Sequence, residues 1–159
     1  MRVEKDFEEF IELLNKHKVR YVIVGAYALA FHVRPRMTGD IDFLVAGTIG
    51  NVEKLMRVLD EFGFGNVGLT RADFLDPNRV VQLGFEPNRI DILSEIAGVD
   101  FADAYRKRVQ GSFGKQKAWF LSSSDLLKSK RAAGRPKDKA DVQLLMSSLR
   151  KRRRRNDVG

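Results

Sequence analysis

The sequence contains no cysteine and only two histidines, His17 and His32. Without cysteine, both a disulfide framework and a thiolate metal site are excluded. Two histidines are too few for a metal site built from several imidazoles. A hard cation held by oxygen ligands remains possible, because carboxylates and carbonyl groups suit Mg²⁺.

Long apolar runs are also missing. No run reaches the roughly 18 residues that a membrane span requires. The first residues, Met1-Arg2-Val3-Glu4-Lys5-Asp6, do not have the pattern of a signal peptide. These absences predict a cytoplasmic protein without a membrane partner. Hydrophobic residues make up 43% of the chain and charged residues 31%, which is typical of a globular domain with a buried core.

The positive charge is unevenly distributed along the 159 residues. The net charge is +8, of which residues 150–159 carry +5 and residues 1–149 only +3. We therefore expect a single domain over residues 1–149 and a basic tail over residues 150–159, which is either flexible or the end of the last helix. Such a tail either binds nucleic acid or another polyanion, or simply keeps a helix end soluble.

Apolar periodicity divides the chain into helices and strands. The predicted helices span residues 5–17, 26–32, 50–62, 71–75, 100–108 and 122–134, with a last helix from 136 towards the basic tail. The predicted strands span residues 19–24, 40–45, 80–85, 89–93 and 117–121. Only a short link separates the 80–85 and 89–93 strands, so we expect them to form a hairpin.

Two aspartates in the 40–45 strand are the strongest chemical signal. Asp40 and Asp42 alternate with apolar residues, so both carboxylates share one face of the strand. Two strand steps place their Cα atoms about 6.6 Å apart. Carboxylates at that spacing can close on one metal ion, or on two ions about 3.5–4 Å apart. The alternative is a solvated, acidic face of a sheet edge.

Gly25 and Asp91 strengthen the metal interpretation. Gly25 lies between a buried strand and a helix, where backbone N–H groups can receive an anion. Asp91 lies inside an apolar strand, where a carboxylate is costly unless it is solvated, paired or metal-bound. If residues 89–93 lie beside residues 40–45, three carboxylates converge and can hold two Mg²⁺ ions together with triphosphate oxygens. The alternatives for Asp91 are an ion pair with Arg89 or a solvated edge of the sheet.

The order of these motifs resembles that of the minimal nucleotidyltransferases of the polymerase-β-like superfamily. Their pattern is Gly-[Gly/Ser], a helical spacer, Asp-x-[Asp/Glu] and a third carboxylate on a later strand. The matching segments are Val24-Gly25-Ala26, Arg36-Met37-Thr38-Gly39-Asp40-Ile41-Asp42 and Asp91. Residues 125–141 resemble the end of small stand-alone members, including members linked to toxin–antitoxin and phage-defence systems.

The resemblance covers residues 5–149 and implies a palm-like nucleotidyltransferase fold. That fold is of the α/β (α+β) class, with a mixed sheet of about four to six strands flanked by helices. The implied activity is Mg²⁺-dependent transfer of a nucleoside monophosphate from an NTP to a hydroxyl of a protein, an RNA or a small molecule, with Mn²⁺ as an alternative ion. Because the chain is short, a partner subunit is expected to supply acceptor recognition, as in two-component toxin–antitoxin systems.

The resemblance also implies a role for each matched residue. Asp40 and Asp42 hold both ions, and Asp91 holds the ion that activates the attacking hydroxyl and accepts its proton. The residues implied in nucleotide binding are Gly25, Ala26, Arg36, Thr38 and Lys130. For Arg36, Thr38 and Lys130, a purely structural or solvated role is the alternative.

Ala26 departs from the family pattern, which has glycine or serine at this position. A serine would offer a hydroxyl to a phosphate, whereas alanine offers only its backbone N–H, which still belongs to an anion-binding turn. Ala26 therefore favours a second hypothesis, a catalytically inactive nucleotidyltransferase fold that acts as a binding or antitoxin-like module. The basic tail supports a third hypothesis, a basic nucleic-acid-binding protein.

Overall fold

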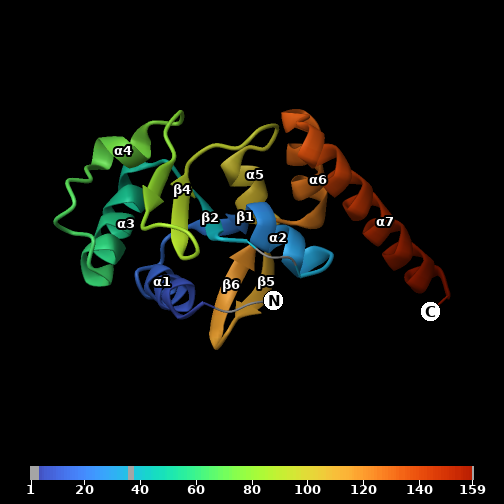
Figure 1. Cartoon of the computed structure of the whole chain (residues 1–159), viewed down its shortest axis with the longest axis horizontal. Helices are drawn as coiled ribbons and strands as arrows, with labels where there is room; N and C mark the ends of the chain where they lie inside the picture. Colours follow the sequence, from blue (N-terminus) through green and yellow to red (C-terminus); the bar gives the residue numbers. More distant parts are fainter. Residues whose placement is uncertain (1–3, 36–37, 159) are drawn as a thin grey trace.

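The computed structural model of the chain describes residues 4–35 and 38–158, and it contains one sheet with helices on both faces (Figure 1). The helices are α1 (Lys5–Lys16), α2 (Gly25–His32), α3 (Ile49–Phe62), α4 (Arg71–Leu75), α5 (Phe101–Arg106), α6 (Ser123–Ala133) and α7 (Pro136–Val158). The strands are β1 (Tyr21–Val24), β2 (Asp40–Val45), β3 (Val81–Leu83), β4 (Arg89–Leu93), β5 (Val109–Phe113) and β6 (Gln116–Phe120).

The sheet is mixed, with six strands in the order β3-β4-β2-β1-β6-β5. The central strand β2 pairs antiparallel with β1 and parallel with β4. Strands β3 and β4 form the expected hairpin, and β1 pairs parallel with β6. The predicted class, a mixed sheet flanked by helices, is confirmed.

The larger part of the core lies between the sheet and helices α1 and α3. The alternation in β2 buries Ile41, Phe43 and Val45 on this face, and the Phe10 ring of α1 lies 5.4 Å from the Phe43 ring. Each such fully buried side chain contributes about 2 kcal/mol through apolar burial. This anchoring fixes the strand so that its two aspartates point to the opposite face.

The second face of the sheet is covered by α2, α5, α6 and α7. Helix α6 begins where the Ser122 hydroxyl accepts a hydrogen bond from the Asp125 N–H at 3.2 Å, at the start predicted for the 122–134 helix. It ends at Gly134, and Pro136 opens α7, which continues without a break through residues 150–158. Among the described residues, no helix is both long enough and apolar enough to cross a membrane.

Strand β5 is the element that the sequence did not predict. Its centre, Gln110-Gly111-Ser112, contains no apolar side chain, and its pairing with β6 holds it extended along the edge of the sheet. A Cβ at Gly111 would lie 2.7 Å from the Phe31 ring, so glycine allows α2 to pack closely on this strand. Tertiary pairing, rather than local propensity, produces this strand.

Candidate active site

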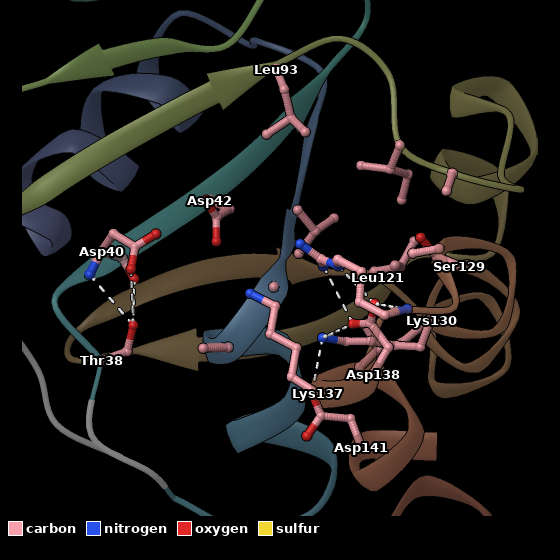
Figure 2. Close-up of a pocket in the computed structure, with 18 of the residues that line it drawn as sticks. Thr38, Asp40, Asp42, Leu93, Leu121, Ser129, Lys130, Lys137, Asp138 and Asp141 are labelled. Atoms are coloured by element: carbon pink, nitrogen blue, oxygen red, sulfur yellow. Dashed lines mark hydrogen bonds and ion pairs between the residues drawn. The ribbon is translucent and has the colours of Figure 1, made fainter.

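A cleft of about 570 Å³ opens beside the start of α2 (Figure 2). Its walls come from β2, from the N-terminal turn of α2, from the loop that follows β4 and from α6 and α7. The predicted residues that line it are Gly25, Ala26, Thr38, Asp40, Asp42 and Lys130. Segments more than 100 positions apart in the sequence therefore meet in one cavity.

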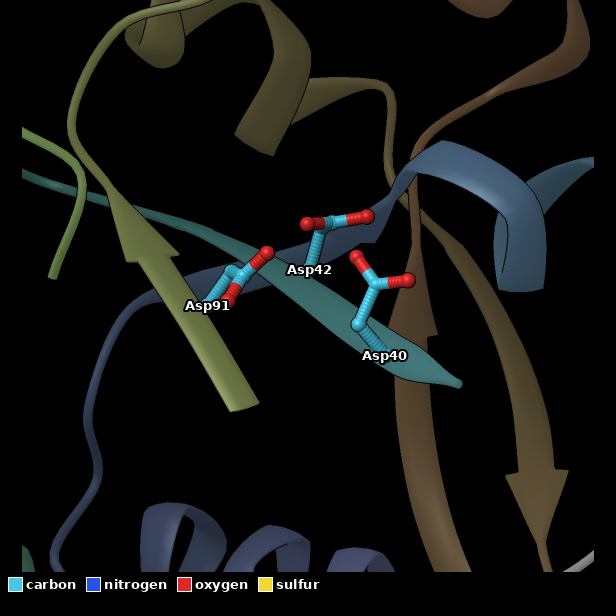
Figure 3. Close-up of side chains that lie close together, drawn as sticks. All are labelled: Asp40, Asp42 and Asp91. Carbon is cyan, nitrogen blue, oxygen red and sulfur yellow. The ribbon is translucent and has the colours of Figure 1, made fainter. Parts of the chain in front are cut away.

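Asp40, Asp42 and Asp91 converge at one side of this cleft (Figure 3). The parallel pairing of β2 with β4 places Asp42 directly opposite Asp91 in the register. One carboxylate oxygen from each of the three residues lies within 4.8 Å of the others. Asp91 itself is buried, with 5% of its surface exposed. Three oxygen donors at this spacing fit a divalent cation such as Mg²⁺.

Arg89 is the counter-ion of this trio. Asp91 therefore also forms the ion pair with Arg89 that the sequence offered as an alternative. Its Nε donates to Asp91 Oδ1 at 2.9 Å and its Nη2 donates to Asp91 Oδ2 at 3.1 Å, a bidentate pair. Arg89 Nη2 also lies 3.4 Å from Asp40 Oδ2. One guanidinium compensates only one of three carboxylates, so the part of the chain that the structure describes leaves an excess of negative charge here.

Asp42 has an unusual acidity. Its burial raises its pKa from 3.8 to about 7, and the nearby charges of Asp40 and Asp91 act in the same direction. Arg89 lowers the pKa but does not outweigh the burial. A cation placed among the three carboxylates would favour the ionised form of Asp42, because it replaces the lost solvation.

Gly25 brings the start of α2 against Asp42. Its φ is +66°, which disfavours residues with a side chain. A Cβ at this position would collide with Asp42 Oδ2 and lie 3.1 Å from Asp42 Cγ. The Val24 N-cap provides no side-chain hydrogen bond, so the first N–H groups of α2 stay available for an anion beside the carboxylates.

The neighbours of Gly25 have different roles. Ala26 lines the cleft and contributes no hydroxyl. Tyr27, whose hydroxyl would be the nearest replacement for a serine at position 26, is buried and packs edge-on against Phe7, with ring centroids 5.8 Å apart. Its ring therefore belongs to the core rather than to the cleft.

Thr38 holds Asp40 in place. Its hydroxyl lies 3.1 Å from the Asp40 carbonyl oxygen and 3.2 Å from Asp40 Oδ1, within donating distance of both. It therefore stands beside the trio rather than on the far side of the cleft. Arg36, the other predicted residue of this segment, lies outside the described residues.

Lys130 lines the opposite side of the cleft, within a network of charged side chains (Figure 2). Its Nζ lies 3.0 Å from Asp141 Oδ2 and 3.5 Å from Asp138 Oδ1. Asp138 is fully buried and accepts a 2.7 Å hydrogen bond from Arg135 Nε. That bond lowers the pKa of Asp138 to about 2. The network joins α6 to α7 and holds Lys130 at the cleft wall.

Several lining residues were not anticipated from the sequence. They include Lys137 at the start of α7 and Ile96 and Ala97 in the turn after β4. Gly98 follows them with a φ of +70°, and a Cβ there would lie 2.6 Å from the Cβ of Ala132. In the sequence, Gly98 was the one indication that this turn packs closely against α6.

Comparison with known families matches residues 2–151 to the family described as nucleotidyltransferase of unknown function (DUF6036). The match covers nearly the whole chain, so the protein belongs to this nucleotidyltransferase family. No protein with a curated description matches the sequence.

Two solved structures share the fold. The lincosamide antibiotic adenylyltransferase LnuA, solved with bound lincomycin, superposes with a TM-score of 0.57 and 16% identity over 91% of this chain and 97% of its own. An antigenic nucleotidyltransferase-like protein from Paracoccidioides brasiliensis gives a TM-score of 0.51 and 16% identity over 92% of this chain and 77% of its own. At these identities the similarity concerns the fold alone.

Proposed function

We propose that the protein is a Mg²⁺-dependent nucleotidyltransferase that transfers a nucleoside monophosphate from an NTP to a hydroxyl group. The observation that carries the proposal is the convergence of Asp40, Asp42 and Asp91 beside the N–H groups at the start of α2, where Val24 provides no side-chain cap. Triphosphates are bound by cations and N–H donors, and this cleft offers both kinds of partner.

The carboxylate oxygens fit Mg²⁺, and Mn²⁺ takes the same ligand type. Asp40 and Asp42 would hold two ions, and Asp91 would share the ion nearer the acceptor. When bound, such ions lower the pKa of the acceptor hydroxyl and neutralise charge that develops on the phosphates.

The remaining groups of the cleft bind and orient the nucleotide. The N–H groups of Gly25 and Ala26 donate to phosphate oxygens, and Lys130 supplies a positive charge from the opposite wall. The acceptor oxygen forms a bond to the α-phosphorus, the bond to the β-phosphate bridging oxygen breaks, and pyrophosphate leaves. Asp91 accepts the proton of the attacking hydroxyl.

The acceptor belongs to one of three classes: a protein side chain, an RNA end or a small molecule. The adenylyltransferase LnuA, solved with lincomycin, shows that this fold accommodates small molecules. A cytoplasmic setting, a partner subunit and a toxin–antitoxin pairing complete the proposal, and they rest on the resemblance of residues 5–149 to small stand-alone members.

Ala26 and Arg89 favour a second candidate, an inactive module of the same fold. Ala26 removes a hydroxyl from the phosphate turn, and Arg89 already neutralises part of the trio. Against this candidate, a scaffold gains nothing from three crowded carboxylates, of which burial and the other two raise the pKa of Asp42.

A labelled-nucleotide transfer assay tests the proposal. Each of the four α-labelled NTPs is incubated with the protein, Mg²⁺, total RNA and cell lysate, and labelled products are separated by class. We expect transfer by the wild type and none by Asp42→Asn. A control, Glu12→Gln, makes the same carboxylate-to-amide change on the exposed side of α1 and should remain active. Equal labelling by wild type and Asp42→Asn would refute the catalytic role.

A further inference from the structure

The C-terminal turns of α7 form a dense basic surface. Arg150, Lys151 and the arginines of residues 152–155 are consecutive and exposed. Successive helical residues are separated by about 100°, so six in a row surround the helix rather than form one stripe. None of the ion pairs among residues 4–35 and 38–158 involves these six side chains.

Arg152 attaches this surface to the body of the protein. It follows the buried Leu145 by about two helical turns and so lies on the packed side of α7. Its Nη2 donates to the carbonyl oxygen of His32 at 3.0 Å. His32 is the last residue of α2, where carbonyl groups lack helical partners. Arg152 therefore caps α2 and fixes the basic surface beside its C-terminal end.

The other end of α2 is the phosphate turn of the cleft. Helix α2 contains eight residues, which corresponds to about 12 Å between Gly25 and the end that Arg152 contacts. The exposed Arg34 comes two residues after α2, on the segment that returns to Asp40. Figure 1 shows α7 passing α2 on its way to the C-terminus. The basic surface and the acidic trio are thus joined by one short, rigid helix.

The composition of this surface favours nucleic acid over a membrane as its partner. Residues 150–157 contain no apolar side chain, so they lack the hydrophobic face with which an amphipathic helix enters a membrane. Five of the six basic residues are arginines, whose planar guanidinium groups match phosphate oxygens in a bidentate manner. Nucleic acid combines closely spaced phosphates with a terminal hydroxyl, which is the group that the cleft requires.

We infer that residues 150–155 and Arg34 bind the phosphates of an RNA whose unpaired 3′ end enters the cleft as the acceptor. This inference rests on the proposed function. The terminal ribose oxygen attacks the α-phosphorus of the NTP, the RNA becomes one nucleotide longer, and pyrophosphate is released. The basic surface contributes affinity without sequence preference, because it contacts only the backbone.

Binding is measured by fluorescence anisotropy with a short single-stranded RNA and the full chain, at several salt concentrations. The test variant combines Arg150→Glu, Arg153→Glu and Arg154→Glu and keeps Arg152, so the cap of α2 survives. The expected result is at least about 10-fold weaker binding, with a salt slope reduced by about two, since each lost phosphate contact removes about 0.7 for a single strand. Circular dichroism verifies that both proteins are folded.

The control variant has the same change in net charge at three exposed sites away from this surface. It combines Lys5→Glu on α1, Arg57→Glu on α3 and Lys115→Glu between β5 and β6. It should bind RNA within about 2-fold of the wild type if the surface on α7 is the specific contact. Equal losses in the two triple variants would overturn the inference, because they would show attraction to net charge alone.

Two further measurements identify the acceptor. An RNA whose 3′ ribose has been oxidised by periodate should bind equally well and accept no label, whereas continued labelling would overturn the assignment of the 3′ hydroxyl. Polyglutamate of equal charge should compete poorly, and competition equal to that of RNA would indicate an acidic protein partner instead. Transfer to a protein or small molecule, without transfer to RNA, would refute this inference and leave the proposed function intact.

Discussion

Two clusters of aspartates face each other across the cleft, and they differ in charge balance. On β2 and β4, Asp40, Asp42 and Asp91 share Arg89, the one cation that residues 4–35 and 38–158 place beside them. On α6 and α7, the buried Asp138 and its neighbour Asp141 are matched by Lys130 and Arg135. Figure 2 shows Asp40 and Asp42 on one wall of the cleft, with Lys130, Asp138 and Asp141 on the other. Among the described residues, carboxylates therefore outnumber cations on the first wall and are matched by them on the second.

The pKa values follow this difference. Burial raises the pKa of Asp42 to about 7, whereas a hydrogen bond from Arg135 lowers that of Asp138 to about 2. In a balanced network each charge already has a partner, so the network needs no further ion, and removing one partner is costly. An unbalanced trio is strained without one, which is the property expected of a site that binds metal and charged substrate. Burial alone does not distinguish these two roles, because Asp91 on one wall is buried like Asp138 and Asp141 on the other.

The largest expected effect is on catalysis. Asp42→Asn should reduce nucleotide transfer by about 10³-fold, since it removes a ligand whose charge stabilises the transition state. The melting temperature should stay the same or rise, because the substitution relieves repulsion within the trio. Single-turnover labelling and a thermal melt on the same preparation check both parts. A destabilised variant would contradict the view that the trio is in excess.

The matching change on the other wall should act on stability. Asp138→Asn leaves Lys130 and Arg135 with one carboxylate fewer and should cost about 3 kcal/mol of unfolding free energy. For a domain of this length each kcal/mol corresponds to about 2–4 °C in Tm. Urea titration measures the loss, and Asp103→Asn, an exposed carboxylate on α5, serves as the control. A loss no greater than the control's would show that the network is dispensable.

Gly25 tests how closely α2 approaches the trio. Gly25→Ala introduces a Cβ at a φ of +66° against Asp42, which should cost about 2 kcal/mol and weaken nucleotide binding. Gly50→Ala is the matched control, because a Cβ there meets nothing within 4 Å. Since Gly50 is helical, its replacement should stabilise the protein by up to about 1 kcal/mol. Equal effects at the two glycines would exclude a steric requirement at Gly25.

The wall that carries Asp40, Asp42 and Asp91 could be predicted from the sequence, because the patterns that indicate it are local. The period of two in residues 40–45 placed Asp40 and Asp42 on one face, and an aspartate inside the apolar 89–93 strand suggested a partner for them. Gly25 at a strand-to-helix junction gave the phosphate turn. Each of these features depends on neighbours that are close in the sequence.

The charge network on the opposite wall could not be predicted in the same way. The sequence showed Lys130, Arg135, Asp138 and Asp141, but many pairings fit four charges on two helices. Which charges meet depends on the angle between α6 and α7, and tertiary packing sets that angle. The contact of Arg89 with both Asp40 and Asp91 similarly depends on the register between β2 and β4. Strand β5 depends on pairing rather than on its own residues.

Metal binding by the wall that carries Asp42 should depend on pH, because the pKa of Asp42 is raised. In the metal-free protein, the raised pKa of Asp42 means that the folded state binds more protons than the unfolded state, so stability falls as pH rises from 3.8 to about 7. Metal requires the ionised carboxylate, so Mg²⁺ affinity should increase about 10-fold between pH 6 and pH 8. Calorimetry measures it, and pH-independent affinity would argue against Asp42 as a ligand.

The smallest expected effect concerns Arg89, the only cation that the described residues place on the trio. Arg89→Gln removes a positive charge close to Asp40 and Asp91, and at an effective dielectric near 20 this should tighten Mn²⁺ binding several-fold, by about 1 kcal/mol. Without Arg89, the Asp91 side chain is held less firmly, which opposes the gain in Mn²⁺ affinity. The pairing of Asp91 with Asp42 in the sheet still fixes the Asp91 backbone.

Electron paramagnetic resonance of Mn²⁺ without nucleotide measures the change, and Arg106→Gln, which pairs with Asp103 on the exposed side of α5, is the control. Weaker Mn²⁺ binding in Arg89→Gln would mean that Arg89 positions Asp91 as a ligand more than it competes with the ion. The three aspartates would then resemble the charge network of α6 and α7, because Arg89 would be a permanent structural partner of the site.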